Sequence, residues 1–337
     1  MSLNIGVIGC GYWGPNIIRN FNQIDSTNLY YICDLDQKKM EHIKKSYPSV
    51  KTTTDYKDIL KDPKIDAVAI AVPVAYHYSI AKDALLSGKH VLVEKPLANS
   101  VKEVEELINI TKEKNLILMV DHTFEYAEAV NKIKEIYESG ELGDIYYMRA
   151  DWFNLGLLQP DVNVILDLVT HVISIISYVT GLKPVSLTAN GSAYLRKDIL
   201  EIAHLKIKYP KNITAYVTAS WLEPRKTRGL TIVGSKKLLV YDQINLEEQV
   251  KIYDKGVDVT KQQDDVSQIK INYRYGDIYA PNIKNIEPLK IMCSHFADCI
   301  IHKKKPRSDG ESGLNIMKVF EAAEESLKNN GKEASLK

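Results

Sequence analysis

The sequence contains three stretches whose residue types and spacing could carry out chemistry. The first, Gly9-Cys10-Gly11-Tyr12-Trp13-Gly14, follows an apolar run and leads into Pro15. Glycine lets a backbone approach a pyrophosphate closely, and the N-terminus of the following helix supplies N–H groups and partial positive charge. Asp34 ends the next apolar run, where a carboxylate would bind a ribose. These residues predict a dinucleotide site, and the alternative is a turn with only a packing role.

The cofactor predicted for this turn is NAD, with NADP less favoured. The carboxylate of Asp34 would bind the ribose diol and repel a 2′-phosphate. No arginine follows to accommodate that phosphate. Lys38 and Lys39 are close to Asp34 in the sequence, so NADP remains the alternative cofactor.

The second stretch is Glu94-Lys95-Pro96, directly after a predicted strand at 89–93. Ligands bind beyond the carboxyl ends of the strands in an open parallel sheet. There, one ammonium group at about 4 Å would stabilise a developing alkoxide by roughly 4 kcal/mol. The alternative is a surface lysine paired with Glu94. At the same edge we expect Val72, His77, Glu94 and Lys95 to contact the cofactor, with packing equally open for His77. We expect His122 to contact the substrate.

The third stretch lies in a predicted helix at 161–180. Asp167 and His171 are one turn apart and share a face. Asn163, Thr170 and Ser174 extend them into a polar stripe without lysine, arginine or glutamate, which indicates the wall of a polar pocket. A carboxylate beside an imidazole suits a general base near neutral pH. A hydrogen-bonded buried histidine is the alternative, and no third ligand at a recognisable spacing supports a metal.

The elements that position these residues predict an α/β fold with two domains. Strands and helices alternate from residue 3 to about 122, as in a doubly wound Rossmann domain at 1–122. The rest, 123–337, predicts an α+β domain with an open, largely antiparallel sheet, because apolar and polar residues alternate over 213–221. The region 254–281 predicts a long loop or lid. Helices are expected at 36–46, 55–60, 75–86, 100–114, 124–139, 161–180, 289–302 and 314–328.

Composition limits the class of protein. The 337 residues include 44 basic and 43 acidic residues, so the formal charge of +1 argues against a nucleic-acid partner. No apolar run reaches membrane length, and no signal peptide precedes the first strand. The four cysteines form no C-x-x-C pair and predict reduced thiols. We therefore expect a soluble, cytoplasmic protein.

Together the glycine turn, Glu94-Lys95-Pro96 and the Asp167/His171 pair resemble the glucose-fructose oxidoreductase, inositol dehydrogenase and MocA family. The resemblance covers essentially the whole chain. It implies an NAD-dependent oxidoreductase in which His171 takes a sugar hydroxyl proton, Asp167 assists and Lys95 stabilises the alkoxide. It also implies a homodimer or homotetramer through the C-terminal sheet.

Within the family, the stretch Asn154-Leu155-Gly156 and Asn163 resemble the nucleotide-sugar branch. That branch implies a UDP-N-acetylglucosamine or UDP-N-acetylglucosaminuronate 3-dehydrogenase in which Asn154 and Asn163 bind substrate. Three positions depart from its pattern, and they bear on the substrate rather than on the catalytic pair: Trp152, Leu166 and Val172. The alternatives are a dehydrogenase of free sugars or inositol, a redox-neutral enzyme that uses bound NAD transiently, and a non-catalytic NAD sensor.

Overall fold

The structure is a computed structural model that describes residues 2–156, 158, 162–261 and 269–336. The chain divides into two compact units. Unit 1 contains residues 1–127 and 286–318, and unit 2 contains residues 128–285 and 319–337.

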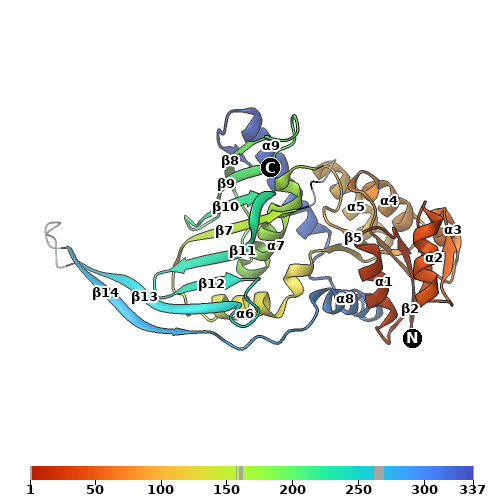
Figure 1. Ribbon diagram of the computed structural model, residues 1–337, viewed down its shortest axis with the longest axis horizontal. Coiled ribbons are helices and arrows are strands. Elements are labelled where there is room, and N and C mark those ends of the chain that lie inside the picture. Colours follow the sequence, from red (N-terminus) through yellow and green to blue (C-terminus); the bar gives the residue numbers. More distant parts are fainter. Residues whose placement is uncertain (1, 157, 159–161, 262–268, 337) are drawn as a thin grey trace. The chain divides into compact units, whose positions relative to one another are not determined.

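Within the described ranges, unit 1 is built on a six-stranded parallel sheet with the order β3-β2-β1-β4-β5-β6. Strands β2 and β5 of this sheet are labelled in Figure 1. This is the doubly wound order, in which the chain switches direction between β1 and β4. The strands are β1 Leu3–Ile8, β2 Thr27–Cys33, β3 Lys51–Thr53, β4 Ala67–Ile70, β5 His90–Glu94 and β6 Leu118–Asp121. The helices between them are α1 Gly14–Asn22, α2 Gln37–Ser46, α3 Tyr56–Lys61, α4 His77–Leu86 and α5 Val101–Lys114.

The predicted elements of unit 1 are present, with small shifts at their ends. Each residue of β4 is buried, as a strand covered on both faces requires. The hydroxyl of Ser100 caps α5 by accepting the N–H of Glu103, and the carboxylate of Glu103 accepts the N–H of Asn99. This is half of a capping box, in which the carboxylate would accept the N–H of Ser100.

Helix α8, Pro288–His302, belongs to unit 1, although the sequence placed it beyond the single boundary at 122/123. Its apolar face joins the core of that unit, where Phe296 lies with its ring 6.2 Å from Phe21 of α1. The chain thus returns to unit 1 after unit 2. Helix α9, Gly310–Lys328, begins in unit 1 and ends in unit 2.

The part of unit 2 that the structure describes forms a nine-stranded sheet with the order β14-β13-β12-β11-β7-β10-β9-β8-β15. The pair β7–β10 is parallel and the other described pairs are antiparallel, which confirms the largely antiparallel prediction. The strands are β7 Ile145–Leu155, β8 Ser186–Ser192, β9 Ile202–Lys208, β10 Thr214–Ser220, β11 Leu222–Gly234, β12 Leu238–Asp242, β13 Val250–Lys261, β14 Ile269–Tyr279 and β15 Ala334–Ser335.

The helices of unit 2 are irregular where they begin. A 3₁₀ turn that still belongs to unit 1, Thr123–Tyr126, precedes α6, Glu128–Glu138, so the single helix expected at 124–139 is interrupted. The helix expected at 161–180 starts with the π-helical turn Ile165–Val169 and continues as α7, Thr170–Thr180. The predicted start at residue 161 lies outside the described residues. π-helical turns inside helices are frequent at functional sites.

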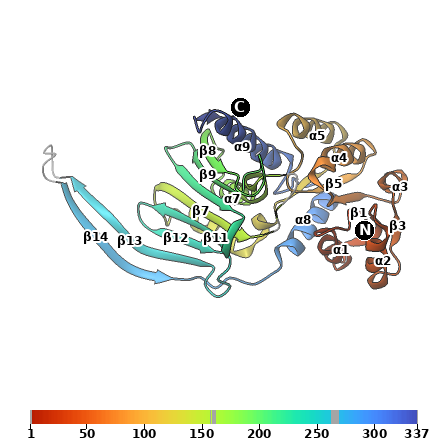
Figure 2. The ribbon, with the colours of Figure 1, turned by 45° about the horizontal axis from the view of Figure 1, so that its top comes forward.

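The prediction of an irregular loop or lid over 254–281 is wrong for the described part of that region. β13 and β14 pair as a long antiparallel hairpin that projects from the sheet (Figure 2). Val250 and Ile252 at the start of β13 are buried, but Lys255, Val257 and Asp258 further along this strand are exposed. The burial pattern that normally indicates a strand is therefore missing from the described side chains beyond the base of the hairpin. One pattern in the sequence does indicate a strand here, because Ile271, Tyr273 and Tyr275 alternate with polar residues. These three side chains are 55%, 67% and 80% exposed.

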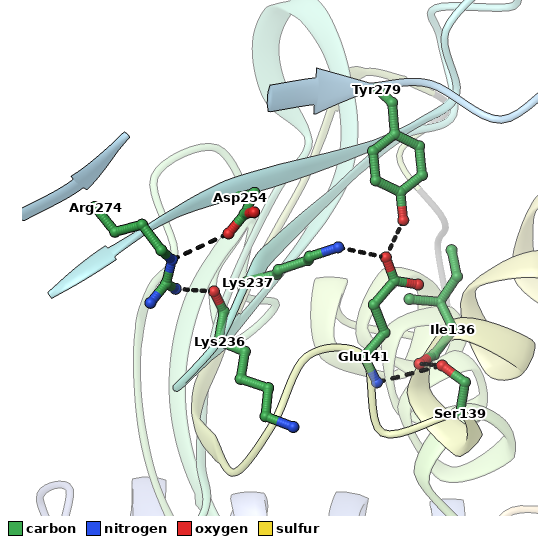
Figure 3. A network of polar contacts seen from close by, with 8 residues as sticks. All are labelled: Ile136, Ser139, Glu141, Lys236, Lys237, Asp254, Arg274 and Tyr279. Carbon is green, nitrogen blue, oxygen red and sulfur yellow. Dashed lines mark hydrogen bonds and ion pairs between the residues drawn. The ribbon is translucent and has the colours of Figure 1, made fainter. Parts of the chain in front are cut away.

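Polar contacts hold the base of the hairpin to the sheet (Figure 3). Arg274 on β14 donates through Nε to Oδ1 of Asp254 on β13 at 3.0 Å. Glu141, in the turn before β7, accepts from Lys237 Nζ at 2.8 Å and from the hydroxyl of Tyr279. Arg274 also donates through Nη2 to the carbonyl oxygen of Lys236, so Tyr279 and Arg274 join the hairpin to two turns of unit 2.

The four cysteines are buried and form no disulfide. No helix in the described ranges has the length and apolar character needed to cross a membrane.

Candidate functional site

The three glycines in the turn after β1 have different environments. Gly9 has a φ of +100°, and a Cβ there would lie 2.2 Å from the carbonyl oxygen of Ala71. A Cβ on Gly14 would lie 2.1 Å from the carbonyl oxygen of Gly9, so Gly14 lets α1 pack against the turn. A Cβ on Gly11 would meet no protein atom within 4 Å. Packing therefore explains Gly9 and Gly14, whereas Gly11 borders open space of the kind a pyrophosphate needs.

The N-terminus of α1 is suited to an anion. Side chains of Asp36, Asp55 and Ser100 cap α2, α3 and α5, but Trp13 provides no side-chain cap for α1. Uncapped N–H groups at a helix start attract phosphate groups. Tyr12 and Trp13 are 81% and 44% exposed, so both rings are accessible. The turn and the helix start fit the pyrophosphate of a dinucleotide.

Asp34 lies just beyond β2, as predicted. Its Oδ2 accepts the backbone N–H of Cys10 at 2.7 Å, and its Oδ1 accepts that of Asp36 at 2.8 Å. Lys39 Nζ lies 3.9 Å from Oδ1. The carboxylate thus joins the glycine turn to the end of β2, the edge at which a ribose would bind.

His77 joins the segments that follow β4 and β5. Its Nδ1 lies 2.6 Å from the carbonyl oxygen of Pro96, and its Nε2 lies 2.8 Å from that of Val72. The side chain is 1% exposed. The structure therefore shows a role in holding backbone, and the contacts of Val72 and His77 with a cofactor stay predictions.

Glu94 and Asp121 end β5 and β6 and are cross-strand partners. They are 8% and 3% exposed. Burial, followed by the charge of Asp121, raises the pKa of Glu94 well above its usual range, and burial raises the pKa of Asp121. Lys95 is half-buried, and its charge lowers both of these pKa values. Lys95 thus lies beside two buried carboxyl groups, and its role in chemistry stays a prediction.

His122 follows Asp121 and is 1% exposed. Neither ring nitrogen has a hydrogen-bond partner in the part of the chain that the structure describes. Burial, followed by the charge of Lys95, lowers the pKa of His122 to about 3. The imidazole is neutral near pH 7 and has one donor and one acceptor to offer a ligand.

In unit 2, Asp167 lies in the π-helical turn and His171 in the first turn of α7. Trp221 Nε1 donates to Asp167 Oδ2 at 3.0 Å. The ring centroids of His171 and Trp152 are 6.3 Å apart. Both tryptophans are buried, whereas Asp167 and His171 are half-buried. A fixed carboxylate and a partly accessible imidazole on one helix suit proton transfer.

The other members of the polar stripe bond within the helix. Asn163 Oδ1 accepts two backbone N–H groups at 3.0 and 3.1 Å, so it caps the π-helical turn. The hydroxyls of Thr170 and Ser174 donate to helix carbonyls at 2.6 and 3.0 Å. This leaves Asp167 and His171 as the candidates for chemistry, and substrate binding by Asn163 stays a prediction.

Asn154 lies near the end of β7, and its buried Oδ1 has no hydrogen-bond partner among the residues described. A buried oxygen of this kind suits a hydrogen bond from a ligand. Contact of Asn154 with the substrate stays a prediction.

Two tryptophan–arginine pairs beside this helix were not identified from the sequence. The guanidinium carbon of Arg228 lies 5.7 Å from the ring centre of Trp152, and that of Arg196 lies 5.4 Å from Trp221. Trp221 follows the alternating run of β10, so its burial was predictable. Its partner Asp167 is 54 positions away, and no local pattern signals that contact.

The comparisons with known proteins bear on the family and the fold. Residues 3–122 match the model "Oxidoreductase family, NAD-binding Rossmann fold", and residues 130–240 match "GFO/IDH/MocA C-terminal domain". The chain is 23% identical to myo-inositol 2-dehydrogenase from Thermotoga maritima, covering 96% of each chain. It is 25% identical to UDP-N-acetylglucosamine 3-dehydrogenase from Acidithiobacillus ferrooxidans, covering 75% of this chain and 78% of the relative.

Among solved structures, scyllo-inositol dehydrogenase from Lactobacillus casei with bound NAD(H) and scyllo-inositol has a TM-score of 0.81 at 19% identity. The match covers 100% of this chain and 99% of that one, and it supports the same fold. The matched domains, the glycine turn and the order of the sheets lead to one assignment. The chain is an NAD-binding oxidoreductase that belongs to the GFO/IDH/MocA family.

Proposed function

We propose that this enzyme is an NAD-dependent dehydrogenase that oxidises the C3 hydroxyl of a UDP-sugar such as UDP-N-acetylglucosamine or its uronate. His171 takes the hydroxyl proton, and Asp167 holds the imidazole in position. Lys95 stabilises the negative charge that develops on the substrate oxygen, while His122, Asn154 and Asn163 are available for substrate contacts. NAD⁺, when bound, would accept the hydride.

One observation carries the choice of base. Asp167 is held by the indole N–H of Trp221 at 3.0 Å, and His171 lies four positions further along the same helix with its ring against Trp152. A rigid carboxylate can orient an imidazole whose proton still exchanges with the surroundings. His122 cannot serve as this base, because its pKa of about 3 is too low for proton uptake near neutral pH.

The positive charges beside Trp152 favour an anionic substrate over inositol. Arg228 is the cross-strand partner of Trp152, and its guanidinium lies over that ring. Lys226 is exposed, and the charge of Arg228 lowers its pKa. Two neighbouring cations suit the diphosphate of a nucleotide sugar, which a neutral polyol lacks.

The preference for NAD rests on Asp34. Its carboxylate is fixed by two backbone N–H groups and would face the ribose with negative charge. We expect NADH to bind more tightly than NADPH, and Asp34→Ser to reduce that difference. Equal or tighter binding of NADPH by the wild type would refute this preference.

A substrate panel tests the proposed function. Purified enzyme with NAD⁺ is offered UDP-N-acetylglucosamine, its uronate, UDP-glucose, myo-inositol and glucose, and NADH absorbance is followed. We expect NADH with a UDP-sugar and little with the neutral compounds, and Arg228→Gln should raise KM for the UDP-sugar. Turnover of inositol alone would refute the nucleotide-sugar assignment. Tightly bound NAD with no NADH from any compound would support a redox-neutral reaction.

We also propose that the enzyme forms a homodimer or homotetramer through the sheet of unit 2. Tyr147 and Tyr216 are 42% and 46% exposed, and their ring centroids are 6.4 Å apart on neighbouring strands. Exposed aromatic side chains are enriched at protein interfaces. Light scattering after size-exclusion chromatography should give a multiple of 38.1 kDa. Tyr216→Asp should lower that mass, and a monomeric wild type would contradict the proposal.

A further inference from the structure

We propose that Glu94 and Asp121 share a single proton and act as one singly charged counter-ion that positions the ammonium group of Lys95. The role given to Lys95 rests on the proposed function. The shared proton does not, because it can be observed without substrate.

The strand register brings the two carboxyl groups together. Glu94 and Asp121 are cross-strand partners at the ends of adjacent parallel strands, and such strands lie about 4.8 Å apart. Partners in register point to the same face of a sheet. Both side chains are more than nine-tenths buried. Two carboxylates in this position would repel each other at short range without water to screen them.

The hydrogen bonds leave room for one proton. The N–H of Lys95 donates to Glu94 Oε2 at 3.2 Å, and Thr123 donates to Asp121 Oδ1 through its N–H at 3.1 Å and through its hydroxyl. Asp121 Oδ2 is buried with no donor in the described part of the chain. Two ionised carboxylates are acceptors only and cannot bond to each other. One proton supplies the missing donor between Glu94 and Asp121.

The groups that face the pair balance a single negative charge. Lys95 acts on both carboxyl groups as a cation. His122 is neutral near pH 7, because burial and the charge of Lys95 lower its pKa to about 3. On α8, burial and then the charge of Asp121 raise the pKa of the Cys293 thiol well above its usual range, so this thiol is also neutral. One ammonium group thus faces one negative charge.

This arrangement positions Lys95 without using all of the N–H donors of its ammonium group. An ammonium group has three N–H donors, so one can be directed to the pair while others remain for a substrate oxygen. A pair with two negative charges would have to be matched by a second cation, and a pair with none would leave the ammonium without a counter-ion.

Infrared difference spectroscopy on the whole enzyme at neutral pH tests the shared proton. Wild type is compared with Glu94→Gln and with Asp121→Asn, and the C=O stretch of protonated carboxyl groups is followed in H₂O and D₂O. We expect each single substitution to remove one protonated-carboxyl band and no carboxylate band. Glu125→Gln is the control, because burial also raises the pKa of this carboxyl group. Its band should be lost independently of the other two.

The other outcomes overturn the proposal. If both groups are ionised, each substitution removes a carboxylate band instead. If both are protonated, each removes one protonated band and leaves a second, so only Glu94→Gln/Asp121→Asn removes both.

Two substitutions at Lys95 test the link between this residue and the pair. Lys95→Met removes the charge at similar length, so the remaining carboxylate should take up a proton and a second protonated band should appear. Lys95→Arg keeps the charge and should keep one band. Unchanged spectra in Lys95→Met would overturn the coupling. Because these spectra need no substrate, failure of the dehydrogenase proposal would show only in the activity panel.

Kinetics then test positioning. We expect Glu94→Gln/Asp121→Asn to lower kcat by about 10²-fold in the wild type but by less than about threefold in Lys95→Met, because the pair acts through the lysine. Equal losses in both backgrounds would show a role unrelated to Lys95.

Discussion

Two histidines, one in each unit, illustrate how burial decides what an ionisable group can do. His122 at the edge of the parallel sheet is 1% exposed, and its pKa is lowered to about 3. His171 on α7 is half-buried and packs on an indole ring. A group that cannot take up a proton near pH 7 can only bind, whereas a partly accessible imidazole can exchange its proton during turnover. Burial thus suits His122 to a binding role and leaves His171 as the candidate base.

The largest expected effect separates the two histidines by activity. We expect His171→Ala to lower kcat/KM by about 10³-fold, the range typical for loss of a general base. His122→Ala should act mainly on KM and by less than about 10²-fold, because a neutral binding group is lost. His204→Ala, an exposed histidine on β9, is the matched control for unit 2. A larger kcat loss in His122→Ala than in His171→Ala would reverse the assignment.

The next effect distinguishes Gly9, which we expect to affect stability, from Gly11, which we expect to affect NADH binding. Gly9→Ala should destabilise the enzyme by about 3 kcal/mol, because a positive φ and a contact of 2.2 Å are both unfavourable for a Cβ. Gly11→Ala should keep the Tm of the wild type and weaken NADH binding by at least about tenfold. Thermal unfolding and a titration of NADH fluorescence measure the two quantities. An NADH affinity equal to that of the wild type in Gly11→Ala would contradict binding of the pyrophosphate at this turn.

A smaller effect concerns the stability of unit 1 as a function of pH. Burial lowers the pKa of His122 to about 3, from about 6.5 in an unfolded chain. The stability gained from keeping this group neutral is fully present above pH 6.5 and is lost as the pH falls toward 3. Between pH 7 and pH 5 the wild type should lose about 2 kcal/mol more than His122→Asn. Urea unfolding at both pH values measures this, and parallel pH dependences would contradict the burial argument.

The smallest expected effect concerns the support of the base in unit 2. Trp221→Phe removes the donor to Asp167, so we expect a loss of about 1 kcal/mol in unfolding free energy and a lower kcat. Trp13→Phe, at an exposed ring, is the control for stability alone. An unchanged kcat in Trp221→Phe would mean that the indole does not support catalysis.

The sequence predicted most of unit 1 and less of unit 2. Strand ends are local features, so the glycine turn, Asp34 and Lys95 could be placed at one edge from the order of strands. The pairing of Glu94 with Asp121 depends on register between strands that α5 separates, and the alternation of elements does not determine register. The contact of Trp221 with Asp167 depends on packing between a strand and a helix far apart in the chain. The hairpin of β13 and β14 was misinterpreted because its described residues beyond the base are largely exposed, so their sequence does not alternate between buried and exposed positions.

Isotope transfer tests the central proposal most directly. UDP-N-acetylglucosamine or its uronate, deuterated at C3, is incubated with excess enzyme and NAD⁺. The NADH and the UDP-sugar are then analysed by mass spectrometry. We predict deuterated NADH from the wild type and none above background from His171→Ala. Unlabelled NADH with deuterium retained at C3, or undiminished transfer in His171→Ala, would contradict oxidation at C3 with His171 as the base.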